Sequence, residues 1–402
     1  MKAAYSILLL AFTSVFPYQL QAQCDRAQMV LDYQTEYLGS SVTNLELDWT
    51  GDVSTCDPGT ISELAQTRTL QRINYFRQLV GLPLATEFDS LQNINCQAAA
   101  LMMDANDALD HDPPPSWDCF TQAGAQAAGS SNLARGAHSS SAIRLFMYDE
   151  GVPSLGHRRW IIKPNNTVFG HGSTPEGCAL YVFGSSGPNP VVPFTAYPSP
   201  GFFPAPLADV ETWSFSIPGA NFGNASVSMI RPDGSPISLT PLPLPNGFGD
   251  PTIGFTPTGI LTNSPFDETY TIQINQVLLP DSTLQNYTYE VTIAPVSYPP
   301  QCPDSLTWSE DDCACTSATN IELLSRVVWK VYPNPATNGI TLHIDASFIG
   351  ASYRVLDLTG QQVEAGKILS EETSLSIDHW PKGVYLIQVM GAIQLTRKFI
   401  KE

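Results

Sequence analysis

Charged side chains are scarce in this sequence of 402 residues, and basic ones are the scarcest. Lys and Arg number 19 against 38 Asp and Glu, which gives a formal net charge of −19 with only 14% charged residues. A field of that sign repels nucleic acid and anionic membrane surfaces, so neither is expected as a main partner. No run approaches the roughly 18 apolar residues that a spanning helix needs, so the mature chain is expected not to span a membrane.

Two short motifs are also missing. No Cys-x-x-Cys pair suggests a zinc knuckle, and no Gly-x-Ser-x-Gly elbow surrounds a candidate serine nucleophile. By contrast, 33 Pro and 28 Gly residues favour long loops and β structure over helical bundles. The hydrophobic fraction of 43% is enough to bury more than one core, and the length is typical of about two or three domains.

The N-terminus has the pattern of an export signal. Lys2 supplies a positive charge, residues 6–16 form an apolar run and Ala22 offers a small residue for cleavage, so 1–22 are predicted to be a signal peptide. A buried N-terminal strand is the alternative. Export permits disulfides, and we favour them over metal ligation, although spacing does not reveal their pairing. The even set of cysteines comprises Cys24, Cys56, Cys96, Cys119, Cys178, Cys302, Cys313 and Cys315.

Shifts in composition and in hydrophobic period divide the rest of the chain. Helical periodicity is confined to one region, and an alternation with period two, typical of a β-sandwich, follows it after a proline-rich stretch. The predicted segments are an N-terminal extension (23–60), a helical domain (61–185), a Pro-rich linker (186–207), a β-sandwich (208–296), a Cys-containing linker (297–330) and a small β domain (331–402).

Three helices are expected in the helical domain. Thr60 and Glu63 have the spacing of a capping box before the first helix, and Gly81 can end it. A proline run stops the second helix, and the third places Ile143 and Phe146 inward. The second and third helices are predicted over 87–109 and 141–150, with a helical turn over 156–162 and a strand over 178–183.

The last 70 or so residues carry several motifs in a fixed order. They resemble the C-terminal sorting domain of the type IX secretion system of Bacteroidetes-type bacteria. That resemblance implies Sec export to the periplasm, handover to the type IX machinery through 331–402, and a secreted or outer-surface location, frequently with removal of this domain. It implies nothing about catalysis. The motifs are YPNPATNG (332–339), YRVLDLTG (353–360), PKGVYLI (381–387) and RKFIK (397–401).

The helical domain has an ordered set of motifs of its own. They resemble a bacterial CAP domain, from the superfamily of cysteine-rich secretory, antigen 5 and pathogenesis-related (SCP-like) proteins. The resemblance implies an α-β-α sandwich. We therefore expect an α+β multidomain chain with a CAP domain, a β-sandwich and a small C-terminal β-sandwich. The motifs are Asn74 and Arg77 before GLPL (81–84), LDHDP (109–113), SSNL (130–133) and GHRRW (156–160).

The CAP resemblance also nominates a cleft. In that family the cleft commonly holds two histidines and two acidic residues, which in some members bind a divalent metal such as zinc. His111 and His157 match the two histidines and are the candidate metal ligands. The first acidic position falls on Ser131, beside Asn132, so this chain lacks one carboxylate and the tetrad is incomplete.

Asp149 and Glu150 both qualify for the second acidic position, and spacing does not separate them. Acids near a helix C-terminus are disfavoured by about 0.3–1 kcal/mol each, a conflict typical of functional sites. Two imidazoles, one carboxylate and a water would form an open tetrahedral zinc centre. Alternatively, His111 merely complements a helix dipole, and the acids form solvated ion pairs with Arg158 or Arg159.

Three functions follow from these patterns. The leading hypothesis is a secreted or surface CAP-domain protein that binds an extracellular ligand in the His-containing cleft, with no activity assigned. The second is a metal-dependent extracellular hydrolase acting on peptide or polysaccharide. The third is a surface adhesion protein that binds through the β-sandwich. The serines at 139–141 are better explained as helix-capping candidates than as nucleophiles.

Overall fold

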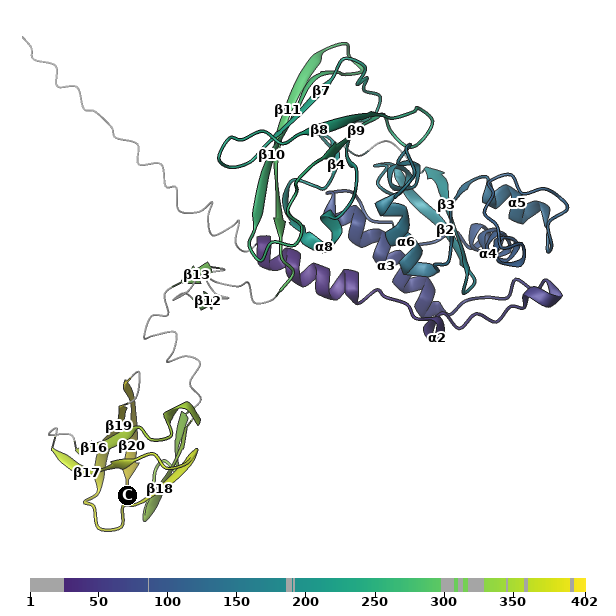
Figure 1. The fold of residues 1–402 in the computed structure, drawn as a ribbon. Coiled ribbons are helices and arrows are strands. Elements are labelled where there is room, and N and C mark those ends of the chain that lie inside the picture. The colour runs from purple at the N-terminus through teal and green to yellow at the C-terminus, as the bar shows by residue number, and fades with distance from the viewer. Residues whose placement is uncertain are drawn as a thin grey trace, which may run out of the picture. The chain divides into compact units, whose positions relative to one another are not determined.

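The chain divides into two compact units, Met1–Gln301 and Cys302–Glu402 (Figure 1). The predicted signal peptide and most of the 297–330 linker lie outside the residues that the structure describes. In the part of the chain described, no helix has both the length and the hydropathy of a membrane span. The structure, a computed structural model, describes residues 25–85, 87–185, 190, 192–297, 307–309, 314–316, 329–344, 346–357, 361–390 and 394–402.

A three-stranded antiparallel sheet forms the centre of the CAP-like part. β1 (Ser131–Arg135), β2 (Asn166–Ser173) and β3 (Gly177–Ser185) pair in the order β1-β3-β2. Because alternate side chains of a strand point to opposite faces, Leu180 joins the core on one side and Ala179 the core on the other. The central strand is therefore buried from both sides.

Two helix pairs cover this sheet, and Figure 1 shows β2 and β3 between them. α3 (Glu63–Leu79) and α6 (Ser139–Tyr148) pack on one face, and α4 (Ser90–Ala105) and α5 (Gln122–Ala128) pack on the other. The expected α-β-α sandwich is confirmed. The short helices of the chain are α2 (Asn44–Leu47), η2 (Val53–Thr55), α7 (Gly156–Ile161), α8 (Ala205–Ala208) and η3 (Ala346–Phe348).

Helix boundaries differ from the expected ones because other side chains cap them. Ser62 caps α3, since its Oγ accepts a hydrogen bond from the Ala65 amide at 3.0 Å, and the predicted Thr60 cap is wrong. α4 begins after Asp89, whose carboxylate accepts from the Gln92 amide at 2.9 Å. That helix is consequently shorter than the predicted 87–109. α6 buries Ile143 and Phe146 as expected.

Two four-stranded sheets form the β-sandwich that follows. The expected alternation is confirmed in β10, where Tyr270, Ile272 and Ile274 are buried. One sheet has the order β5-β11-β10-β7 and the other β4-β6-β9-β8. Their bounds are β4 (Thr195–Tyr197), β5 (Gly201–Pro204), β6 (Trp213–Ser216), β7 (Ser226–Ile230), β8 (Leu239–Pro243), β9 (Thr252–Pro257), β10 (Glu268–Leu278) and β11 (Leu284–Ala294).

The segment 186–207, expected to be a linker, instead supplies one strand to each sheet. β4 pairs antiparallel with β6, and β5 pairs parallel with β11. Both are edge strands, where a proline, which has no amide hydrogen, is tolerated because one side of the strand needs no partner. The proline-rich composition therefore did not separate an edge strand from a linker.

The CAP-like part and the sandwich share one continuous core. Phe76 of α3 and Tyr197 of β4 face each other with ring centroids 6.3 Å apart, and Trp213 of β6 belongs to the same cluster. The residues at 25–38, expected to be a polar extension, form a helix that continues into η1 (Tyr33–Leu38). Arg26 in this helix pairs with Asp267 of the sandwich at 2.9 Å.

Cysteine pairing is seen at one bond in the described residues, where Cys56 and Cys119 form a disulfide. This bond ties the N-terminal segment to the loop that follows α4. Cys96 and Cys178 are free thiols buried in the CAP-like part. The prediction of disulfides is therefore confirmed for Cys56 and Cys119 and is wrong for Cys96 and Cys178.

The second unit is a small β-sandwich with a core of its own, which includes Trp329, Leu342, Val355 and Phe399. Its sheets have the orders β14-β15-β18 and β17-β16-β19-β20. Remaining strands are β12 (Thr307–Ser309), β13 (Ala314–Thr316), β14 (Trp329–Tyr332), β15 (Gly339–Ile344), β16 (Ser352–Asp357), β17 (Gln362–Lys367), β18 (Glu372–Ser376), β19 (Gly383–Met390) and β20 (Gln394–Lys401).

Candidate functional site

His111 and His157 line one cleft of about 290 Å³ in the first unit. His111 comes from the loop after α4, and His157 is the second residue of α7. Ser131 and Asn132 of β1 line the same cleft. The structure thus brings together four of the residues nominated from the sequence, which come from β1, α7 and the loop after α4.

The His157 ring is held by a buried carboxylate. Its Nδ1 lies 2.7 Å from Asp149 Oδ1, and the Asp149 side chain is fully buried, whereas that of His157 is 23% exposed. The second carboxylate oxygen of Asp149 accepts a hydrogen bond from the Arg158 amide at 2.9 Å. Asp149 ends α6 in the left-handed conformation at φ +54°, which Asp tolerates better than most residues. That backbone conformation turns its side chain toward α7.

His111 is oriented in the same manner by a different acceptor. Its Nδ1 lies 2.9 Å from the backbone carbonyl of Ala128. A carbonyl oxygen only accepts, so Nδ1 carries the hydrogen, and Nε2 is the ring nitrogen with the lone pair. The contact of His157 with a carboxylate favours the same tautomer. Both rings therefore present Nε2 as their basic nitrogen.

Glu150 does not take part in this arrangement, because it is exposed and does not line the cleft. Of the two acidic candidates, the structure places Asp149 beside His157. Neither Arg158 nor Arg159 forms the solvated ion pair that we considered, because both arginines are buried and donate to backbone carbonyls. Burial lowers the pKa of Arg159 to about 10, so its guanidinium stays charged at neutral pH.

Asn132 connects β1 to α7 across the cleft. Its side-chain amide donates to the backbone carbonyl of His157 at 3.0 Å, which fixes the start of α7 against β1. Ser131 occupies the position where the CAP resemblance led us to look for an acid, and its Oγ lies 3.6 Å from the Cys96 sulfur. The cleft wall is thus neutral at this point.

The residues of the cleft do not supply a full zinc ligand set. Among the described residues, no group of three or more His, Cys, Asp or Glu side chains could hold a metal ion. A catalytic zinc usually has three protein ligands, and the two imidazoles provide two. Both oxygens of Asp149 are engaged, by His157 and by the Arg158 amide. The residues of the cleft therefore do not fit a catalytic zinc with three protein ligands.

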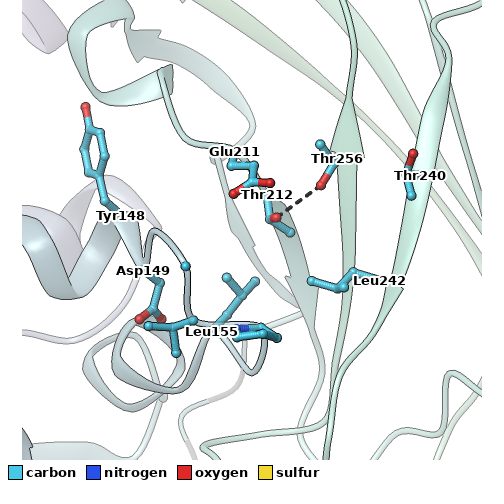
Figure 2. Close-up of a pocket in the computed structure, with 11 residues that line it drawn as sticks. Tyr148, Asp149, Leu155, Glu211, Thr212, Thr240, Leu242 and Thr256 are labelled. Carbon is cyan, nitrogen blue, oxygen red and sulfur yellow. Dashed lines mark hydrogen bonds between the residues drawn. The ribbon is translucent and has the colours of Figure 1, made fainter.

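A second cavity of about 450 Å³ lies between the end of α6 and the sandwich, and Asp149 is one of the residues that line it. Figure 2 shows Tyr148 and Asp149 on one wall, with Thr212, Thr256 and Leu242 on the opposite wall. The Thr212 and Thr256 hydroxyl oxygens are 3.2 Å apart. Sequence reasoning missed this cavity because its strand-side residues are distant along the chain from α6.

Phe248 is the other residue that sequence reasoning missed. It lies in the loop between β8 and β9 of the sandwich and lines the cleft with His111 and His157. No local pattern marks it, since it is one aromatic residue in a loop rich in Gly and Pro. The hydrogen bonds between Arg159 and that loop are what place it.

Comparison with known families agrees with the geometry. Residues 70–184 match the Cysteine-rich secretory protein family, and residues 330–402 match the Secretion system C-terminal sorting domain. The chain carries a CAP domain and a type IX sorting domain. It is therefore a secreted or cell-surface protein exported by the type IX system. No curated protein matches the chain.

Solved structures that resemble parts of this chain match it only with low TM-scores. PorZ of Porphyromonas gingivalis, a surface component of the type IX system, is 22% identical over 22% of this chain, which covers 13% of PorZ, at a TM-score of 0.18. An immunoglobulin-like DUF3244 protein from Bacteroides vulgatus is 22% identical, covering 19% of this chain and 95% of its own, at 0.16. The CsuC–CsuE pilus complex of Acinetobacter baumannii is 14% identical, covering 50% and 95%, at 0.16.

Proposed function

We propose that the CAP domain binds an extracellular ligand in the cleft shared by His111 and His157. The observation that supports this most directly is the paired orientation of the two rings. Each is fixed through Nδ1 by a protein acceptor, and both line the same cleft. Nitrogens held in this way can accept hydrogen bonds from a ligand without first losing rotational freedom.

The test is a ligand screen on the purified full chain. Thermal shift with neutral saccharides, short peptides and lipids would identify binders, and calorimetry would then compare wild type with His157→Gln. His343→Gln is the matched control, because His343 is a partly exposed histidine of the second unit. We expect His157→Gln to weaken each genuine binder and His343→Gln to leave it unchanged. If no binder depends on His157, the proposal fails.

Export is the second part of the proposal. We infer that 1–22 direct Sec export to the periplasm and that 331–402 then engage the type IX machinery. Deleting 331–402 should leave the protein in the periplasm, and N-terminal sequencing of that species should begin at residue 23. Cytoplasmic retention of the deleted form would contradict the signal-peptide assignment, whereas surface display of the deleted form would contradict the role of the tail.

Hydrolysis is a second candidate function, and the Asp149–His157 contact favours it. A carboxylate that holds one tautomer of an imidazole is the arrangement of a general base. The neutral Ser131 position argues for a single base rather than a pair of acids. Turnover of a peptide or polysaccharide by wild type, lost in His157→Gln, would support this function. Calorimetric titration of wild type and His157→Ala with zinc tests whether the cleft binds the metal. Identical weak heats from both proteins would exclude zinc binding through His157.

A further inference from the structure

We infer that the β-sandwich completes the CAP cleft and that the completed cleft binds a neutral saccharide. Phe248 of the sandwich, with Trp160 of α7 and Phe183 of β3, would form an aromatic wall against which a sugar ring stacks. This inference rests on the proposed function and names the ligand class. It also assigns a binding role to a residue outside the segment that matches the family.

Phe248 lies directly against the start of α7. A Cβ atom added to Gly156 would come within 2.8 Å of Phe248 Cδ1, so the ring packs where Gly156 has no side chain. Gly156 immediately precedes His157 in the chain. The ring and the imidazole are consequently neighbours in one cleft, although one residue belongs to the sandwich and the other to the CAP domain.

Arg159 holds the loop that carries Phe248. One terminal nitrogen, Nη1, donates to the Pro245 carbonyl at 2.9 Å, and the other, Nη2, donates to the Asp250 carbonyl at 2.9 Å. Gly249 also approaches closely, since an added Cβ would lie 2.6 Å from the Arg159 carbonyl oxygen. A buried guanidinium thus fixes the loop on both sides of Phe248. The position of the ring is therefore a built feature of the interface between sandwich and CAP domain.

Two of the three aromatic side chains of the cleft are exposed to solvent. Phe183 is 48% exposed and Phe248 is 37% exposed, while Trp160 packs on Phe183 with ring centroids 4.8 Å apart. Exposed aromatic groups gathered in one concave site are typical of ligand binding, because their apolar surface is otherwise left in water. A flat, partly apolar ligand would cover these faces.

The charge of the cleft narrows the ligand class. Of the described residues that line it, none is Asp, Glu, Lys or Arg. The chain as a whole carries a net charge of −19, which disfavours polyanionic polysaccharides. A neutral pyranose has C–H groups on its faces, which can stack on an aromatic ring, and hydroxyl groups at its edge, which can donate to His111 and His157. Most glycoside hydrolases use two carboxylates, and no carboxylate lines this cleft. We therefore expect the saccharide to be bound and not cleaved.

Calorimetry with cellohexaose and chitohexaose tests the inference on the full chain. Phe248→Ala removes the aromatic ring, and Phe266→Ala is the matched control, because Phe266 is a 65% exposed phenylalanine on another loop of the same sandwich. We expect at least one of these saccharides to bind wild type and Phe266→Ala equally. Phe248→Ala should weaken that binding by at least about tenfold, and Phe248→Trp should restore it. Equal melting temperatures would show that both alanine variants fold.

The alternative outcomes separate this inference from the proposed function. If His157→Gln abolishes saccharide binding but Phe248→Ala does not, the cleft binds the ligand and the role of the sandwich is refuted. If neither variant matters, both the inference and the location of the site are wrong. If neither saccharide binds at millimolar concentration, or if a neutral hexapeptide binds through Phe248 instead, the saccharide class is wrong.

Discussion

Acid should destabilise the first unit through one buried imidazole, that of His171 in β2. The side chain is fully buried, with Nδ1 3.1 Å from Gln66 Oε1 and Nε2 3.0 Å from Ser173 Oγ. Both partners are neutral, so no opposite charge offsets the loss of water around a charged ring. Burial, helped by the nearby charge of His138, lowers the pKa of His171 to about 3.

The sign of the pH effect follows from this depressed pKa. In the unfolded chain the pKa of His171 returns to about 6.5, so between about pH 6.5 and pH 3 the unfolded state binds more protons than the folded state. The stabilisation is fully present above about pH 6.5 and is lost as the pH falls toward 3. The free energy of unfolding should fall by about 1.4 kcal/mol per pH unit, and by at most about 5 kcal/mol in total.

Urea unfolding at a series of pH values from about 7 to 4 measures this slope. His171→Gln should flatten it, because a glutamine can keep a polar contact to Gln66 or Ser173 but does not titrate. His379→Gln, which changes an exposed histidine of the second unit, should leave the slope as in wild type. If wild type and His171→Gln lose stability in parallel on acidification, the reasoning about His171 is refuted.

Three other predictions concern buried groups of the CAP domain. Arg77 donates to four backbone carbonyls, so Arg77→Met should lower the free energy of unfolding by at least about 3 kcal/mol in urea; a loss below about 1 kcal/mol would contradict this. Asp149→Asn keeps the left-handed backbone but replaces one carboxylate oxygen with an amide group. We expect the free energy of unfolding to fall by about 1–3 kcal/mol and nitrogen NMR to show mixed tautomers of His157. A single unchanged tautomer would contradict the orienting role of Asp149. Burial raises the pKa of Cys96 to about 11 and that of Cys178 to about 12. Iodoacetamide should therefore alkylate both thiols only after unfolding, which peptide mapping can measure. Labelling of Cys178 in the native protein would refute this prediction.

Local patterns predicted those elements whose burial follows a simple period. The inward side of α6 and the alternation in β10 were both readable, because each element buries one face against a continuous core. Motif order placed His111 and His157 as candidates, and the structure brings both to one cleft. In these cases the information lies within a few residues of each position.

Features that depend on distant contacts could not be read in this way. The segment 186–207 has a linker composition, yet it forms edge strands because β6 and β11 offer partners far along the chain. Arg158 and Arg159 look like surface residues by type, but each donates to carbonyls of α6 or of the loop before α7 and also to a carbonyl that the docked sandwich supplies. Phe248 is placed by the same contact. Such residues have no local signal because their partners are set by tertiary structure.

The burial of Arg158 has a consequence for how this chain could have been assembled in evolution. Its guanidinium donates to the Thr212 carbonyl at 2.7 Å, beyond the family-matching segment at 70–184. A recombination event that moved only that segment into another gene would strip the arginine of an acceptor and leave Phe76 without Tyr197. The unit that can be inherited intact is therefore larger than residues 70–184, which match the family. Lineages that keep this CAP domain should also keep the sandwich that follows it.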